Sequence, residues 1–216
     1  MKDIRYGIYL RPDPRTCWVQ AQLNVLLYQQ FGVVSAAAFP PHATLVGNLK
    51  TEATPDELVE RVGDALRGVC AFPVFNKGIE RSRSAFVFNV NENGQGGRNE
   101  PFARLAADMK AALLPVSLPI DDFLVTPLKD YEFKGHLSLV SHDLMVDDSR
   151  AAEIGEFLEE LHVEYPPMSM GNVVMLYETT TDDWRGHWWT SLQCHHLRSW
   201  TLPNEFVEES AEPHVV

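Results

Sequence analysis

The chain has 216 residues, of which 45% are hydrophobic and 22% charged, and its formal net charge is -12. This length and apolar content fit one folded domain and exclude wholesale disorder. The acidic balance argues against a long nucleic-acid duplex or an anionic membrane as partner, because both carry negative charge. It leaves open a small anionic substrate in a local cleft, because a pocket sets its own electrostatic potential.

No apolar run approaches the roughly 20 residues that a membrane helix needs, and charged residues occupy the N-terminus where a secretory signal would be apolar. The three cysteines, Cys17, Cys70 and Cys194, lie far apart, which favours buried thiols in a reducing compartment over disulfides or a zinc site. We therefore expect a cytoplasmic protein without a resident metal or cofactor.

Strands and helices should alternate along the first half of the chain. The residue patterns predict, in order, a strand over 4–10, a helix over 16–31, a strand over 42–49, a helix beginning at 54, strands over 72–79 and 85–91, and a helix over 100–114. The helix over 16–31 should turn Val19, Leu23, Leu26, Leu27 and Phe31 inward.

The second half should repeat this alternation. An irregular stretch over 115–127 precedes a predicted strand over 135–141, a helix over 149–162, strands over 172–178 and 194–202, and an acidic, frayed tail over 203–216.

The two halves share a pattern. His42-Ala43-Thr44-Leu45-Val46 begins a strand that leads to a helix and another strand, and His136-Leu137-Ser138-Leu139-Val140 does the same. This repetition predicts two related lobes, interleaved within one domain over 1–202, each giving one strand to a shared centre.

Each repeated segment places an imidazole beside a hydroxyl. Residues two apart in a strand point to the same face, so His42 lies beside Thr44 and His136 beside Ser138, while the residues between them face the packed side. Displacement at phosphorus needs a base on the attacking oxygen and an acid on the leaving oxygen, and imidazole can do either near neutral pH. Hydroxyl donors would stabilise the charge on the phosphate oxygens.

The histidine–hydroxyl spacing alone is a weak signal, and two strand histidines bonded to backbone remain an alternative. The order Phe39-Pro40-Pro41-His42-Ala43-Thr44 and then Gly135-His136-Leu137-Ser138 resembles the 2H phosphoesterase superfamily, which includes cyclic nucleotide phosphodiesterases and 2′-5′ RNA ligase-like proteins. Ser138 stands where many members have threonine.

This resemblance implies an α+β, bilobal, pseudo-twofold fold, with two antiparallel sheets facing a central groove and helices outside. It also implies metal-independent hydrolysis of a 2′,3′- or 1″,2″-cyclic nucleotide phosphate. His136 would activate water, His42 would protonate the leaving ribose oxygen, and Thr44 and Ser138 would hold the phosphate. The substrate would be a small nucleotide or short oligonucleotide, and the protein a monomer.

Four further residues are candidates for substrate binding. Tyr9 is expected near the groove, and Tyr177 could stack on a base, although both also fit half-buried strand tyrosines. Arg185 and Trp188 belong to the run Trp184-Arg185-Gly186-His187-Trp188-Trp189, which fits a loop over the groove or a hairpin whose indoles pack against a sheet edge.

Two other functions stay open. One is RNA-end processing or 2′-5′ ligation, which would need a basic path to the cleft. The other is a module that binds a nucleotide without turnover, for which two histidines placed as acid and base would be unnecessary.

Overall fold

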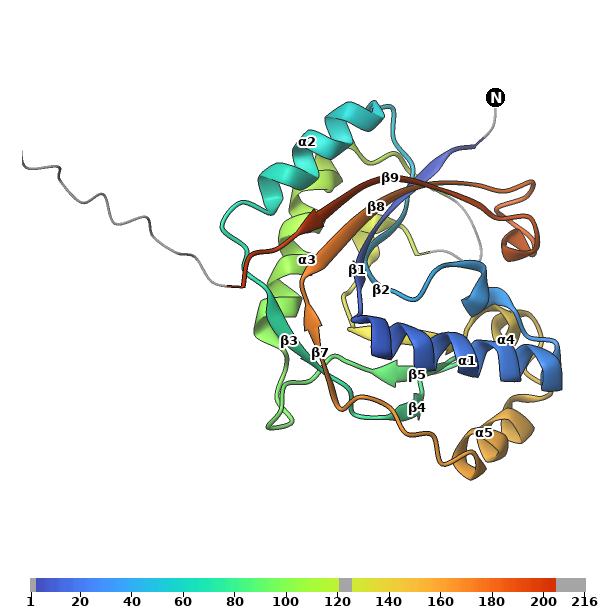
Figure 1. The fold of residues 1–216 in the computed structure, drawn as a ribbon. Coiled ribbons are helices and arrows are strands. Elements are labelled where there is room, and N and C mark those ends of the chain that lie inside the picture. The colour runs from blue at the N-terminus through green and yellow to red at the C-terminus, as the bar shows by residue number, and fades with distance from the viewer. Residues whose placement is uncertain (1–2, 121–125, 205–216) are drawn as a thin grey trace, which may run out of the picture.

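The computed structural model describes residues 3–120 and 126–204 (Figure 1). The strands are β1 (Arg5–Arg11), β2 (Ala43–Leu49), β3 (Phe72–Phe75), β4 (Ile79–Arg81), β5 (Phe86–Asn89), β6 (His136–Val140), β7 (Met168–Gly171), β8 (Val173–Thr180) and β9 (Gln193–Thr201). The α-helices are α1 (Pro14–Phe31), α2 (Pro55–Ala65), α3 (Glu100–Leu113), α4 (His142–Val146) and α5 (Ala151–Glu160). Short 3₁₀ helices include η1 (Ser35–Ala38), η3 (Leu128–Asp130) and η4 (Trp188–Thr190).

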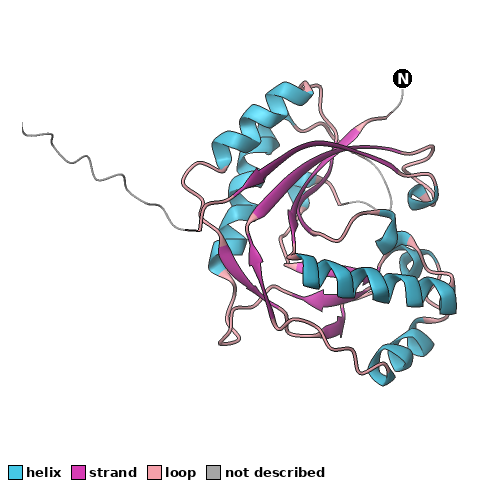
Figure 2. Cartoon of the chain, viewed as in Figure 1, coloured by secondary structure: helices cyan, strands magenta, loops and turns pink. Residues whose placement is uncertain are grey.

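The strands form antiparallel sheets, as the family resemblance implies (Figure 2). One sheet has the order β2-β1-β8-β9, and the other has the order β4-β5-β6. The strand expected over 72–79 is instead two strands, β3 and β4, because Gly78 has a φ of 106° that a continuous strand does not allow. β3 consequently pairs with β7 in a separate two-stranded sheet.

The helices divide between the two lobes. α2 and α3 pack on each other, and α3 also packs on β2 of the four-stranded sheet (Figure 1). α1 follows β1 in the chain but packs on β6 of the other sheet. The chain therefore passes from the four-stranded sheet, through α1, to the sheet that contains β6. These features confirm the expected α+β fold with two lobes.

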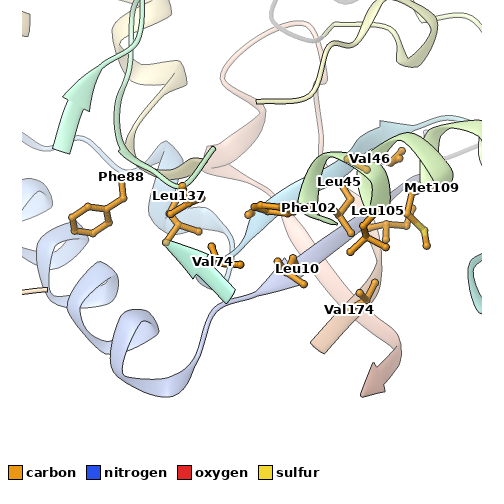
Figure 3. Close-up of a cluster of buried hydrophobic side chains, with 14 of the residues drawn as sticks. Leu10, Leu45, Val46, Val74, Phe88, Phe102, Leu105, Met109, Leu137 and Val174 are labelled. Atoms are coloured by element: carbon orange, nitrogen blue, oxygen red, sulfur yellow. The ribbon is translucent and has the colours of Figure 1, made fainter. Parts of the chain in front are cut away.

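The core is continuous through β2, which directly follows His42, and β6, which begins at His136; these two are here called the motif strands. Ala43 and Leu45 are 2% and 0% exposed, and Leu137 and Leu139 are both 2% exposed. Figure 3 shows Leu45 and Leu137 within this cluster, which includes Phe102 of α3. The residues between histidine and hydroxyl thus face the packed side, and this prediction is confirmed.

Several local predictions were wrong. α1 begins at Pro14, because the Asp13 side chain accepts a hydrogen bond from the Thr16 N–H at 2.8 Å and caps the helix. Leu26 is 40% exposed instead of inward, since the buried face of α1 runs through Leu23 and Leu27. The residue patterns did not predict α4 or β7. The three cysteines are free thiols but only half-buried, and Cys70 follows the end of α2.

Two predicted regions extend beyond the described residues. Within 115–127 the structure describes an isolated bridge between Ser117 and Thr51, while 121–125 lies outside the described residues. Most of the predicted tail, 205–216, also lies outside them. Among the helices that the structure describes, none has the length and apolar content to cross a membrane.

Truncating the packed face of a motif strand should destabilise the fold. Leu45→Ala removes a fully buried side chain behind the Thr44 position, so we expect the free energy of unfolding to fall by roughly 2–5 kcal/mol. Urea denaturation followed by circular dichroism measures the change. Val25→Ala is the control, because Val25 is 54% exposed on α1 and should change stability by less than about 0.5 kcal/mol. Equal effects of the two substitutions would contradict a core that backs β2.

Candidate functional site

One pocket of about 160 Å³ brings together the two histidine–hydroxyl pairs. It is lined by Tyr9, Ser35, Ala36, Phe39, His42, Thr44, Gly47, Asn48, His136, Ser138, Ser141, His142 and Trp188. His42 directly precedes β2 and Thr44 lies at its start, whereas His136 and Ser138 both lie in β6. We call this space the paired-histidine pocket.

The two imidazoles are held in the same way. Nδ1 of His42 lies 2.7 Å from the Pro40 carbonyl oxygen, and Nδ1 of His136 lies 2.7 Å from the Lys134 carbonyl oxygen. A carbonyl oxygen only accepts, so each Nδ1 carries the proton of the hydrogen bond. In the neutral ring this leaves Nε2 with a free lone pair. The local backbone thus fixes one tautomer for both rings, and Nε2 becomes the atom available for chemistry.

Burial keeps both rings neutral in the free protein. Desolvation is the largest cause that lowers the pKa of His42 to about 4; the Pro40 carbonyl opposes this shift, and the neighbouring His136 adds a smaller lowering effect. Desolvation also lowers the pKa of His136, against the Lys134 carbonyl. The interaction between the two imidazoles means that a proton on one disfavours a proton on the other.

Aromatic rings surround His42. The Tyr9 ring lies edge-on to it with centroids 4.4 Å apart, and the Phe39 ring lies 5.3 Å away. Trp188 stands 6.0 Å from Phe39 and completes this wall. These rings shield part of His42 from water, and this desolvation is the main cause of its lowered pKa.

Two glycines make close approaches that shape the pocket. The Tyr9 ring folds back over Gly7, where any Cβ would overlap the tyrosine hydroxyl. Gly135 precedes His136, and a Cβ there would lie 2.9 Å from the Val90 carbonyl oxygen and 3.0 Å from the Phe102 ring. Both positions therefore need glycine, one to admit Tyr9 beside His42 and the other to seat β6 against its neighbour.

The four candidate substrate-binding residues lie in different places. Tyr9 and Trp188 line the paired-histidine pocket. Tyr177 lies outside its lining, with its ring 6.1 Å from Tyr9 and 5.3 Å from His196. Arg185 lines a separate hollow with Arg5 and Lys50. The structure thus brings two of these four residues to the pocket.

The Trp184–Trp189 run combines features of both sequence interpretations. Trp184, Trp188 and Trp189 are 4%, 3% and 7% exposed and form a small hydrophobic cluster of their own in the connection between β8 and β9. Trp188 also contributes to the pocket wall. The indoles are therefore packed, and one of them still borders the site.

One side of the pocket, formed by Ser35, Ser141 and His142, was not predicted from the sequence. Ser35 Oγ lies 3.2 Å from Ser141 Oγ, and Ser141 Oγ lies 3.3 Å from Nδ1 of His142. The Asp143 carboxylate accepts hydrogen bonds from Val34 N and Ser35 N at 3.1 and 2.8 Å. The available signal was that Ser141 and His142 directly follow the second motif strand. Ser35 offered no such signal.

A metal site was not expected from the sequence. Over residues 3–120 and 126–204, no three histidine, cysteine or acidic side chains gather closely enough to hold an ion. His195 and His196, which are adjacent in β9, are both exposed.

Comparisons with known proteins bear on the fold. No protein-family model matches the chain, and no curated protein matches it in sequence. Solved structures do match. E. coli LigT complexed with 3′-AMP has a TM-score of 0.52 and 13% identity, covering 94% of this chain and 99% of that one. LigT in apo form has a TM-score of 0.53 and 15% identity, covering 92% and 97%. A structure described as a phosphoesterase has a TM-score of 0.52 and 13% identity, covering 92% and 98%.

The lowered pKa of His42 should make stability depend on pH. The unfolded chain protonates this imidazole near its usual pKa of about 6.5, whereas the folded chain does so near 4. Between these values the unfolded state binds more protons, so the His42 contribution to stability is complete above about pH 6.5 and is lost as the pH falls toward 4.

We therefore expect the free energy of unfolding of the wild type to fall more steeply than that of His42→Gln over this interval, because glutamine does not titrate. Urea denaturation at a series of pH values measures the difference, and NMR of the imidazole Cε1–H gives the His42 pKa directly. Parallel pH profiles for the two proteins would contradict the burial of a neutral His42.

Proposed function

From the fold of the 2H phosphoesterases, which this chain shares, we propose that the protein is a phosphodiesterase that hydrolyses a 2′,3′- or 1″,2″-cyclic nucleotide phosphate. The observation that carries this proposal is the pairing of two Nδ1-anchored imidazoles with two hydroxyls in one pocket. The LigT structures hold 3′-AMP and ATP, which supports a nucleotide ligand for the same fold.

The reaction uses the two Nε2 atoms in opposite roles. Nε2 of His136 takes a proton from water as its oxygen forms a bond to phosphorus. Nε2 of His42 gives a proton to the ribose oxygen as its bond to phosphorus breaks. Thr44 and Ser138 hold the non-bridging oxygens, where negative charge grows. The product is a phosphomonoester, and proton exchange with solvent restores both rings.

The size of the pocket favours a small substrate. About 160 Å³ accommodates a phosphate and part of a ribose better than a strand of RNA. The paired acid and base favour turnover over simple binding. Tyr9 and Trp188 would contact the nucleoside beside the phosphate, and Tyr177 could extend that surface. RNA-end processing remains the alternative for the same catalytic pair.

Each histidine should be needed for turnover. We expect His42→Ala and His136→Ala to lower kcat by about 10²–10⁴-fold on a nucleoside 2′,3′-cyclic phosphate, which is the usual contribution of a general acid or base. His195→Ala is the control, because His195 is exposed on β9. Chromatographic separation of substrate and phosphomonoester product measures the rates.

The assay runs with a chelator present, because the proposed mechanism needs no metal ion. Wild-type rates in both histidine variants would overturn the assignment of the catalytic pair. Complete dependence on an added metal would overturn the metal-independent chemistry. Binding of the nucleotide without product would instead identify a binding module.

Anion binding should be coupled to proton uptake. The pocket lining within the described residues contains no lysine or arginine, and burial lowers the pKa of both His42 and His136. We therefore expect an imidazole of the pocket to take up a proton from solvent when an anion binds, because the anion stabilises the positively charged ring. We expect the affinity for sulfate, whose own charge is constant here, to rise by about tenfold for each unit of pH decrease over roughly pH 7 to 5.

Isothermal titration calorimetry in buffers of different ionisation enthalpy measures both the affinity and the protons taken up. The variant His42→Gln, with one titrating ring fewer in the pocket, should take up fewer protons. Sulfate affinity that is independent of pH would contradict the coupling.

A further inference from the structure

The motif strands occupy corresponding places in their sheets. β2 is the terminal strand of the order β2-β1-β8-β9, and β6 is the terminal strand of the order β4-β5-β6. A terminal strand presents backbone carbonyls along its outer edge that a further strand would otherwise satisfy. Where such an edge is partly buried, those carbonyls need side-chain donors.

Two side chains supply such donors at equivalent positions. The Tyr131 hydroxyl donates to the Thr44 carbonyl oxygen at 3.2 Å. Gln20 Nε2 donates to the Ser138 carbonyl oxygen at 3.0 Å. Each acceptor belongs to the hydroxyl residue of a motif strand, two positions after the histidine.

The two hydrogen bonds cross between the parts of the chain that carry the two motifs. Tyr131 lies five positions before His136, yet it bonds to β2, which directly follows His42. Gln20 lies in α1, which precedes β2 in the chain, yet it bonds to β6, which carries His136. Thus β2 is hydrogen-bonded to the segment that precedes β6, and β6 is hydrogen-bonded to the helix that precedes β2.

Both donors are themselves held in place. Lys110 of α3 donates to the carbonyl oxygens of Tyr131 and Lys129, at 2.7 and 3.0 Å, which fixes the segment around η3. Gln20 is 2% exposed on the inner face of α1. Its Oε1 is buried without a protein partner among the described residues, so an apolar side chain of the same size would fit this place with less desolvation.

We propose that Tyr131 and Gln20 are positioning residues, which set the spacing of the two motif strands and so keep the two imidazoles at one phosphorus atom. This proposal rests on the proposed function for its consequence in catalysis. Its structural consequence is that these two residues set the separation of the two imidazole rings. NMR can follow a change in this separation through the His42 pKa, without turnover. Neither residue touches the reacting atoms, because both act through the backbone of β2 and β6.

Tyr131→Phe and Gln20→Met each remove one of these hydrogen bonds and little volume. We expect either substitution to lower kcat on a nucleoside 2′,3′-cyclic phosphate by about tenfold while KM changes less than about twofold, because a small displacement affects the transition state more than binding. The matched controls are Tyr28→Phe and Gln22→Met, on exposed positions of α1. They should leave both constants unchanged.

Two measurements separate positioning from a loss of stability. Gln20→Met removes the unpartnered Oε1 but leaves the Ser138 carbonyl without its donor, so this variant should unfold at a somewhat lower urea concentration than the wild type and still be fully folded without denaturant, where kcat is measured. In both variants the His42 pKa, followed by NMR at Cε1–H, should rise toward its ordinary value as the rings separate and water enters.

The proposal is overturned if kcat and the His42 pKa match the wild type in both variants, or if turnover falls only in proportion to lost stability. If the wild type does not hydrolyse the cyclic phosphate, the proposed function fails. The NMR titration then still decides whether Tyr131 and Gln20 set the spacing of the rings.

Discussion

The hydrogen bond from each imidazole Nδ1 to the carbonyl two residues earlier is the constraint on which the site depends. It fixes the tautomer, so that Nε2 rather than Nδ1 is available in the pocket. Because the carbonyl belongs to the residues that lead into the strand, the orientation of each ring is set locally. The two rings are then brought together by the packing of the two lobes against each other. The continuous core behind β2 and β6 supplies that packing.

The electrostatics of the pocket differ from those of the whole chain. The protein carries a net charge of -12, yet the pocket itself is lined by aromatic, hydroxyl and imidazole groups. Desolvation keeps the imidazoles neutral until an anion arrives, and the anion then stabilises the protonated form. The acidic surface therefore does not prevent anion binding, because the positive charge develops inside the pocket with the ligand. This arrangement favours a compact phosphate over a long polyanion, whose remaining charges would face the acidic surface.

The sequence predicted the parts of the site that follow from local periodicity. The two-residue alternation in β2 and β6 was enough to place His42 with Thr44, and His136 with Ser138, opposite the buried Leu45 and Leu137. This local alternation could not place Gln20, Tyr131 or Ser35. Their hydrogen-bond partners lie 118, 87 and 108 residues away in the sequence. The break between β3 and β4 was missed for a different reason. The lone Gly78 in an apolar run does not reveal its positive φ, and the pairing of β3 with β7 depends on tertiary contacts.

The surroundings of the two rings distinguish their roles even though their anchors match. His42 is enclosed by Tyr9 and Phe39, and its pKa of about 4 shows how weakly it holds a proton in the free pocket. A phosphate anion that raises this pKa creates a protonated imidazole in a dry environment. As the bond to the ribose oxygen breaks, negative charge moves from the phosphate to that oxygen, and a weakly basic imidazole gives up its proton readily. In the proposed reaction, the aromatic wall would therefore suit His42 to the role of acid, and His136 would accept the proton from water.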